Sequence, residues 1–251
     1  MSTTIYYFSA TGNSLTSAKM LAGKLSDCRL VPVASVKDNR KIIEESDCVG
    51  FVFPVYYGNM PYPVREMVSK MVFKPETYIF TCMTYRGHAG AAAKRMDQLL
   101  RTRGQKLSLS LGLPMPGNSF INEPQVDAEY LAKQSENIAA IAPRILAREA
   151  EDYADPAVLP MTPIDYPNNF RGIMADDVCT GCGVCAQVCP MGNISIANGK
   201  AVIGDDCATC LACFHWCPAE AIWMSRQENI ARRKKYRHPD TVLADIIAQK
   251  G

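Results

Sequence analysis

The chain has 251 residues, a length that suits two compact domains better than one. Its formal net charge is +2, but the charged residues are unevenly distributed. The segment 151–224 is acidic, whereas the part before it and the tail from 225 are basic. No apolar run approaches the ~20 residues that span a bilayer, and no basic opening segment indicates a secretory signal. These features exclude a membrane-spanning protein. We expect the basic tail to pack on the acidic segment of its own chain rather than bind nucleic acid.

Residues 1–151 alternate short apolar runs with amphipathic stretches, the pattern of a doubly wound α/β domain. The run 49–53 is apolar throughout, as a central parallel strand should be. We therefore predict a parallel five-stranded sheet with flanking helices. The predicted strands are 5–8, 28–33, 49–53, 78–82 and 106–113, and the predicted helices are 14–25, 91–103 and 127–149.

Three loops follow predicted strands at their carboxyl ends, where such sheets bind ligands. The first loop, 9–14, places hydroxyls, an amide and a glycine at a helix N-terminus, which favours an anion. It lacks both the Walker lysine and the glycines of the dinucleotide fingerprint, so a monophosphate held by neutral donors fits it better. The alternative is an ordinary capped helix start.

The other two loops are rich in aromatic residues and glycine. The loop 54–61 offers two tyrosine faces beside Gly58, and the alternative is a packed surface turn. The loop 84–90 adds another tyrosine, two glycines, and the side chains of Arg86 and His88, which can carry positive charge.

Together these loops resemble those of the flavodoxin family, over about residues 3–150. The resemblance implies FMN as prosthetic group, with Gly58 near the flavin N5. The residues that it places at the phosphate are Ser9, Thr11, Gly12, Asn13 and Ser14. Those on one side of the ring are Pro54, Val55, Tyr56, Tyr57, Gly58 and Asn59, and those on the other side are Thr84, Tyr85, Arg86, Gly87, His88 and Gly90.

The charge of the three loops departs from that family's acidic flavin surroundings, because none of them contains an acid. A cation beside the ring would stabilise the reduced anion and raise the potential. We therefore expect Arg86 and His88 to raise it, unless both side chains point to solvent.

A proline-rich segment, 152–172, follows the first domain. Four prolines between 155 and 170 prevent a helix, so we predict an extended connector that wraps the surface.

Residues 173–224 contain two copies of the run C-x2-C-x2-C-x3-C-P. In the bacterial pattern of this kind, the fourth cysteine of each run ligates the other cluster. We therefore predict two [4Fe–4S] clusters. One takes Cys179, Cys182, Cys185 and Cys217, and the other takes Cys207, Cys210, Cys213 and Cys189. Zinc sites use cysteine pairs with a longer spacer, and disulfide frameworks belong to short secreted chains.

The segment resembles the two-[4Fe–4S] ferredoxin family, a small α+β domain. Thiolates held for metal imply a reducing compartment, so we expect a cytoplasmic protein. A hairpin is predicted at 194–202, and a short helix at 241–249 in the tail 225–251. We expect His215 not to be a ligand, Trp216 and Trp223 to pack the cluster core, and the other cysteines, Cys28, Cys48 and Cys82, to be buried.

The whole chain resembles a flavodoxin–ferredoxin fusion family. This implies an electron-transfer protein that relays electrons between FMN and its clusters, with one redox partner at the flavin and another at the clusters. Two alternatives remain. One is an FMN-dependent reductase of a small substrate, for which Tyr57, Tyr85 or His88 would act as acid or base. The other is a redox sensor or assembly module that docks through its clusters. We expect no nucleic-acid partner and no membrane span.

Overall fold

The computed structural model describes residues 2–118, 123–155, 157, 159–162, 172–224 and 235–251. Its central feature is a five-stranded sheet in the order β2-β1-β4-β6-β7, in which every neighbouring pair is parallel. The strands are β1 (Thr3–Tyr7), β2 (Cys28–Pro32), β4 (Cys48–Pro54), β6 (Tyr78–Tyr85) and β7 (Leu109–Pro114). Each corresponds to one predicted strand, so the predicted fold class is confirmed.

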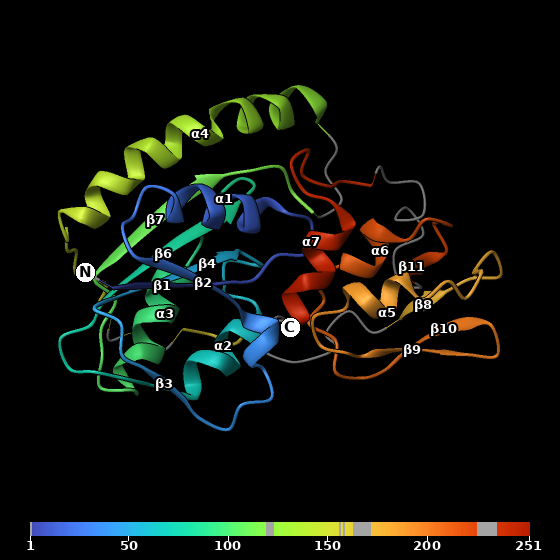
Figure 1. Ribbon diagram of the computed structural model, residues 1–251, viewed down its shortest axis with the longest axis horizontal. Helices are drawn as coiled ribbons and strands as arrows, with labels where there is room; N and C mark the ends of the chain where they lie inside the picture. The colour runs from blue at the N-terminus through green and yellow to red at the C-terminus, as the bar shows by residue number, and fades with distance from the viewer. Residues whose placement is uncertain (1, 119–122, 156, 158, 163–171, 225–234) are drawn as a thin grey trace.

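Helices cover both faces of the sheet (Figure 1). Helices α1 (Asn13–Ala22) and α4 (Pro124–Leu146) lie on one face, and α2 (Tyr62–Ser69) and α3 (Ala92–Arg101) lie on the other. We call this part, from β1 to α4, the sheet domain. Four further elements have no counterpart among the predicted ones: α2, the 3-10 turn η1 (Val33–Val36), and the parallel pair of β3 (Ile42–Glu44) with β5 (Met71–Phe73). These elements are too short for a periodic pattern to stand out.

The core of the sheet domain is centred on β4, whose residues Val49, Phe51, Val52 and Phe53 have no exposed surface. This explains its continuous apolar run, because both faces of the strand are covered by helices. Gly50 lies against β6, and a Cβ atom at this position would be 2.3 Å from the ring of Phe80. The glycine therefore makes room for a large aromatic residue in the core.

The second part, from β8 to β11, is the cluster module. Strands β8 (Ile173–Ala175) and β11 (Ile222–Met224) form one antiparallel pair. Strands β9 (Ile194–Ala197) and β10 (Lys200–Ile203) form the predicted hairpin. The helices α5 (Val184–Val188) and α6 (Ala212–Trp216) each lie inside one cysteine run. The two-residue turn of the hairpin has positive φ at Asn198 and Gly199, which an Asn-Gly pair favours.

The connector between the two parts lies along α3 where it is described. Lys94 forms an ion pair with Asp155 at 2.7 Å, and the amide of Gln98 donates to the carbonyl of Ala157 at 3.0 Å. These contacts agree with a segment that wraps the surface. Its residues 163–171, with two of the four prolines, lie outside the described residues.

The C-terminal segment, residues 235–251, contains α7 (Leu243–Ile247) and the 3-10 turn η3 (Ala248–Lys250) and lies between the sheet domain and the cluster module (Figure 1). Residues 225–234 of the predicted basic tail lie outside the described part. The described part of the tail packs on the acidic segment, as expected, but it also packs on the sheet domain. Lys235 stacks over Phe214 of the cluster module, but Lys19 of α1 pairs with Asp245 at 2.8 Å, so the segment contacts both parts. No described helix is long and apolar enough to cross a membrane.

Candidate functional site: a pocket at the sheet edge and a cysteine module

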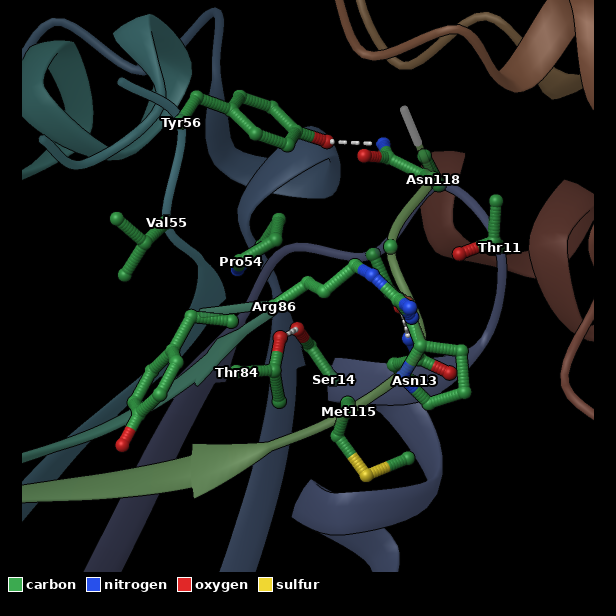
Figure 2. Close-up of a pocket in the computed structure, with 15 residues that line it drawn as sticks. Thr11, Asn13, Ser14, Pro54, Val55, Tyr56, Thr84, Arg86, Met115 and Asn118 are labelled. Atoms are coloured by element: carbon green, nitrogen blue, oxygen red, sulfur yellow. Dashed lines mark hydrogen bonds between the residues drawn. The ribbon is translucent and has the colours of Figure 1, made fainter. Parts of the chain in front are cut away.

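The carboxyl ends of β1, β4, β6 and β7 meet at one edge of the sheet and form a pocket there (Figure 2). The empty space among its lining residues, including the part open to solvent at the mouth, is about 490 Å³. The lining residues are Ser9, Ala10, Thr11, Asn13, Ser14, Pro54, Val55, Tyr56, Thr84, Tyr85, Arg86, Met115, Pro116, Gly117 and Asn118.

The structure brings residues from all three predicted loops into this pocket. The predicted residues that line it are Ser9, Thr11, Asn13, Ser14, Pro54, Val55, Tyr56, Thr84, Tyr85 and Arg86. The predicted residues outside its lining are Gly12, Tyr57, Gly58, Asn59, Gly87, His88 and Gly90. The loop tips therefore lie beyond the pocket, while the residues nearest the strands form its walls.

A fourth loop, 115–118, also lines the pocket and was missed in the sequence analysis. It follows β7, so the rule that identified the other loops, a polar or glycine-rich turn at a strand's carboxyl end, also applies to it. Its residues join the other loops directly. Asn13 Nδ2 donates to the Pro116 carbonyl at 2.7 Å, and Asn118 Nδ2 donates to the Tyr56 hydroxyl at 3.0 Å (Figure 2).

The first loop offers donors suited to a phosphate group. Helix α1 begins after Gly12 without a side-chain cap, although its first residues, Asn13 and Ser14, are buried. Backbone N–H groups of its first turn therefore need an acceptor that the helix does not supply. The Thr11 hydroxyl also bonds to no described residue, while the Ser9 hydroxyl accepts from Gly12 N–H at 3.2 Å. This donor set fits a phosphate monoester.

The side chain of Asn13 is hydrogen-bonded to other parts of the protein. Its amide nitrogen is engaged by Pro116, and its Oδ1 atom accepts a hydrogen bond from the Tyr236 hydroxyl at 2.5 Å. Asn13 therefore ties the first loop to the fourth loop and to the C-terminal segment.

The second and third loops are fixed to each other. Val55 N–H donates to the Thr84 carbonyl at 2.8 Å, and the Thr84 hydroxyl lies 2.9 Å from the Ser14 hydroxyl. Gly58 and Gly90 make a close backbone contact, since a Cβ atom on Gly90 would be 2.5 Å from the Gly58 Cα atom. These glycines hold the two loops together next to the pocket.

The two potential cations of the third loop differ in position. Arg86 lines the pocket and forms ion pairs with Glu123 and Asp127 at the start of α4. Although burial lowers the pKa of Arg86, the hydrogen bonds that it donates to these carboxylates raise it overall. His88 is exposed and lies outside the pocket lining. Acidic groups thus do reach this region, but they come from a helix and not from the loops.

The cysteine runs form a second candidate site. Cys189 of the first run joins Cys207, Cys210 and Cys213 of the second run in the lining of a second, apolar pocket. Among the described residues, no three His, Cys, Asp or Glu side chains converge as they would around one metal ion. Four thiols spread over a cavity fit a cluster with four corners, and soft thiolates suit iron.

The electrostatic neighbours of Cys185 and Cys207 have the same grouping, although Cys185 is also a neighbour of Cys213. Burial raises the pKa of Cys185, and the thiols that add to this rise are Cys217, Cys179 and Cys182. Burial likewise raises the pKa of Cys213 well above its usual value. Such thiols ionise only when a strong counter-charge, such as iron, is present. Backbone N–H groups donate to several of the sulfurs, for example Ala221 N–H at 3.3 Å from Cys217 Sγ.

His215 is buried and fully hydrogen-bonded without any metal. Its Nε2 atom lies 2.8 Å from the Asn118 carbonyl, and its Nδ1 atom accepts from Tyr236 N–H at 3.1 Å. Burial, helped by the charges of Lys235 and Arg237, lowers its pKa to about 4. The neutral ring therefore serves as a structural link between the fourth loop, α6 and the C-terminal segment.

The two tryptophans, and the three cysteines outside the two runs, contribute to the fold rather than to either candidate site. Trp216 is not confined to the cluster core as expected, because it packs with the core of the sheet domain and its indole N–H donates to the Ala10 carbonyl at 2.9 Å. Trp223 lies in β11. Cys48 and Cys82 are fully buried, which raises the pKa of each thiol to about 12, and Cys28 is half-buried.

Comparison with known families defines the class of both parts. The model of a flavodoxin domain matches residues 4–118, and the model of a 4Fe-4S dicluster domain matches residues 172–218. The chain is a flavodoxin–ferredoxin fusion, and so a flavin and iron–sulfur redox protein. A comparison with curated proteins found no match.

Several solved structures are similar to the sheet domain. An azoreductase from Bacillus anthracis has 10% identity and a TM-score of 0.41, covering 57% of this chain and 100% of its own. A flavodoxin from Streptococcus pneumonia TIGR4 has 17% identity and a TM-score of 0.35, covering 56% and 99%. A flavoprotein from Lactobacillus acidophilus, solved in complex with FMN, has 13% identity and a TM-score of 0.35, covering 44% and 92%. The assignment rests on the two domain models.

Proposed function

We propose that this protein relays electrons between one bound FMN and two [4Fe–4S] clusters, and so couples a two-electron partner to a one-electron partner. The observation that carries the proposal is the shared packing of the two sites. Val188, Ala208 and Trp216 of the cluster module belong to the same hydrophobic core as the sheet domain. Trp216 also donates to Ala10, which lines the pocket. A flavin in this pocket and the clusters would therefore belong to one packed body.

Different residues of the pocket would bind the phosphate and the ring of FMN. The Thr11 hydroxyl and the first-turn N–H groups of α1 would hold the phosphate. The walls formed by Tyr56 and Tyr85 would flank the ring and shield it from water. When bound, FMN supplies the ability to accept electrons in pairs or singly, whereas each cluster carries one. We place the protein in the cytoplasm, where thiols stay reduced. One redox partner would bind near the flavin, and another would bind near the clusters.

A reductase acting on a small substrate is less well supported by the pocket. It would need an acid–base residue over the flavin, for which the candidates were Tyr57, Tyr85 and His88. Only Tyr85 lines the pocket, while Tyr57 is 53% exposed and His88 is exposed at the loop tip. We therefore prefer the relay.

The cofactor content tests this proposal. Protein purified without oxygen should carry one FMN, no FAD, and about eight irons and eight sulfides per chain. Iron, sulfide and flavin should be quantified together with the visible spectrum. Stoichiometric zinc with little sulfide would remove the cluster half of the proposal, and protein that binds no FMN would remove the flavin half.

We also propose that the two runs exchange their fourth ligands. Cys189 shares a cavity with the second run, and Cys217 is an electrostatic neighbour of the first run, which supports the exchange. Cys189→Ala should therefore damage the cluster of the second run, and Cys217→Ala should damage that of the first. Paramagnetic spectra of the reduced variants distinguish the two clusters. Each substitution perturbing the cluster of its own run would contradict the exchange.

A further inference from the structure

We infer that the cluster held by the second cysteine run together with Cys189, here the second-run cluster, is the immediate redox neighbour of the flavin pocket. The cluster of the first run, the first-run cluster, is then the outer one, which exchanges electrons with a one-electron carrier. This inference rests on the proposed function and adds the order of its centres. In each internal step one electron passes between the second-run cluster and the flavin, and no bond forms or breaks.

The first observation is a direct link through Asn118. This residue lines the pocket, and its Nδ2 atom donates to the carbonyl of Cys210 at 3.0 Å as well as to the Tyr56 hydroxyl at 3.0 Å. Figure 2 shows the amide of Asn118 facing the Tyr56 ring across the rim of the pocket. One side chain therefore contacts both a pocket wall and a residue that ligates the second-run cluster.

The second observation is the packing of the second run itself. Ala208, Cys210 and Ala212 all belong to the core of the sheet domain, and Cys210 is buried. Val188 of the first run also belongs to this core, but among the described residues no cysteine of that run does. The second run thus lies against the domain that forms the pocket.

The third observation is the exposure of the first run. Cys182 at its middle is exposed, and Cys179 at its start is half-buried. Cys210, which occupies the same position as Cys182 in its own run, is buried. Electron transfer rates fall steeply with distance, so the buried cluster beside the pocket serves the flavin and the exposed cluster serves an external carrier.

Paramagnetic broadening of the FMN phosphorus signal tests this order without measuring activity. Excess dithionite reduces the flavin fully, which leaves it diamagnetic, and makes each reduced cluster paramagnetic. Broadening of the ³¹P line falls steeply with distance, so the nearer cluster dominates it. Cys179 and Cys207 are matched positions, because each opens its run and is half-buried.

In Cys179→Ser protein, the broadening on reduction should remain close to that of the parent. In Cys207→Ser protein, it should fall several-fold. The opposite pattern would overturn the order. Either variant alone decides the question if the other fails to fold, provided that circular dichroism and the paramagnetic spectrum confirm its fold and its remaining cluster.

The parent protein provides a second measurement. Stepwise oxidation with ferricyanide should destroy the more exposed first-run cluster first, so the broadening should survive the loss of the first half of the iron. Broadening that disappears with that first half would contradict the order. Absence of a bound FMN signal or of cluster spectra would instead count against the proposed function, so the two failures are distinguishable.

Discussion

At the residue scale, Arg86 sets the charge next to the pocket that we propose to hold FMN. Its side chain is only 9% exposed and is paired with Glu123 and Asp127. Replacing Arg86 by alanine leaves these two carboxylates uncompensated beside the pocket, which disfavours added negative charge on the flavin. We expect Arg86→Ala to lower the two-electron midpoint potential by about 20–40 mV, which corresponds to ~1–2 kcal/mol. An anaerobic potentiometric titration measures this shift.

The controls for this prediction come from the same loop. Arg86→Lys keeps the charge and should retain most of the parent potential, although it loses the planar fork. His88→Ala should leave the potential unchanged at every pH, because the structure places His88 at the exposed loop tip and outside the pocket lining. An unchanged potential in Arg86→Ala would show that removing the Arg86 charge does not change the electrostatic potential at the flavin.

A buried carboxylate makes the stability of the sheet domain depend on pH. Glu44 is 2% exposed and accepts hydrogen bonds from the Tyr6 hydroxyl and Ser46 N–H, each at 2.7 Å. Burial raises the pKa of Glu44, but these hydrogen bonds more than offset that effect, so the pKa lies below its usual value. The stabilisation is therefore present above the unfolded pKa of about 4.3 and is lost as the pH falls through the lower folded value.

We expect Glu44→Gln to cost about 1–3 kcal/mol of unfolding free energy at neutral pH, because hydrogen bonds to a charged acceptor are lost. The difference from the parent should shrink as the pH falls below about 4. Urea denaturation at several pH values measures both effects. Glu45→Gln, at the exposed neighbouring position, is the control and should change little. A difference that stays constant with pH would mean that Glu44 is not ionised in the fold.

At the element scale, the C-terminal segment closes over the first loop. His238 N–H donates to the Thr11 carbonyl at 2.8 Å, and Thr241 occupies the space beside Gly12. A Cβ atom on Gly12 would be 2.3 Å from Thr241 Oγ1. This segment, which has no cysteine and no loop motif, therefore supports the loop that we propose to hold the phosphate.

We expect Gly12→Ala to displace the C-terminal segment. Gly104 is the matched control, because it also has positive φ but its Cβ position is open. Both substitutions add backbone strain of about 1–2 kcal/mol, whereas only Gly12→Ala adds overpacking of about 1–3 kcal/mol. Denaturation gives the difference, and limited proteolysis should show faster cleavage of the C-terminal segment in Gly12→Ala alone. Equal destabilisation and equal cleavage would mean that the segment does not press on the loop.

At the scale of the whole molecule, the sheet domain and the cluster module share a core, and Trp216 is one of the residues that join them. Its indole N–H bonds to the Ala10 carbonyl, whereas the buried indole nitrogen of Trp223 has no hydrogen-bond partner in the described structure. Trp216→Phe should cost about 1–3 kcal/mol because a buried carbonyl loses its donor. Trp223→Phe should cost less.

Urea denaturation followed by flavin fluorescence and by cluster absorbance measures this pair of variants. Both signals should shift together in Trp216→Phe, because the two parts unfold as one cooperative unit. Separate transitions for flavin and clusters in the parent protein would contradict a shared core. Equal shifts in the two tryptophan variants would show that the bond to Ala10 contributes nothing.

The local patterns of the sequence predicted the elements well. Five apolar runs became the five strands, and the Asn-Gly pair marked the turn between β9 and β10. The doubled cysteine spacing identified the cluster module, because a cluster needs several thiols on one short loop. Three pocket loops were found for the same reason, since parallel strands bring their carboxyl ends to one edge.

The sequence by itself determined the fold class, the three predicted loops and the cysteine runs, because all of these depend on residues close together in the chain. Only the tertiary structure decided which side chains face the pocket. It placed Arg86 inside and paired it with Glu123 and Asp127, while it left His88 outside. It also brought Trp216 to Ala10 and the C-terminal segment to Gly12. Contacts between residues 100 or more positions apart leave no periodic signal, because they arise from complementary surfaces that exist only once the chain has folded.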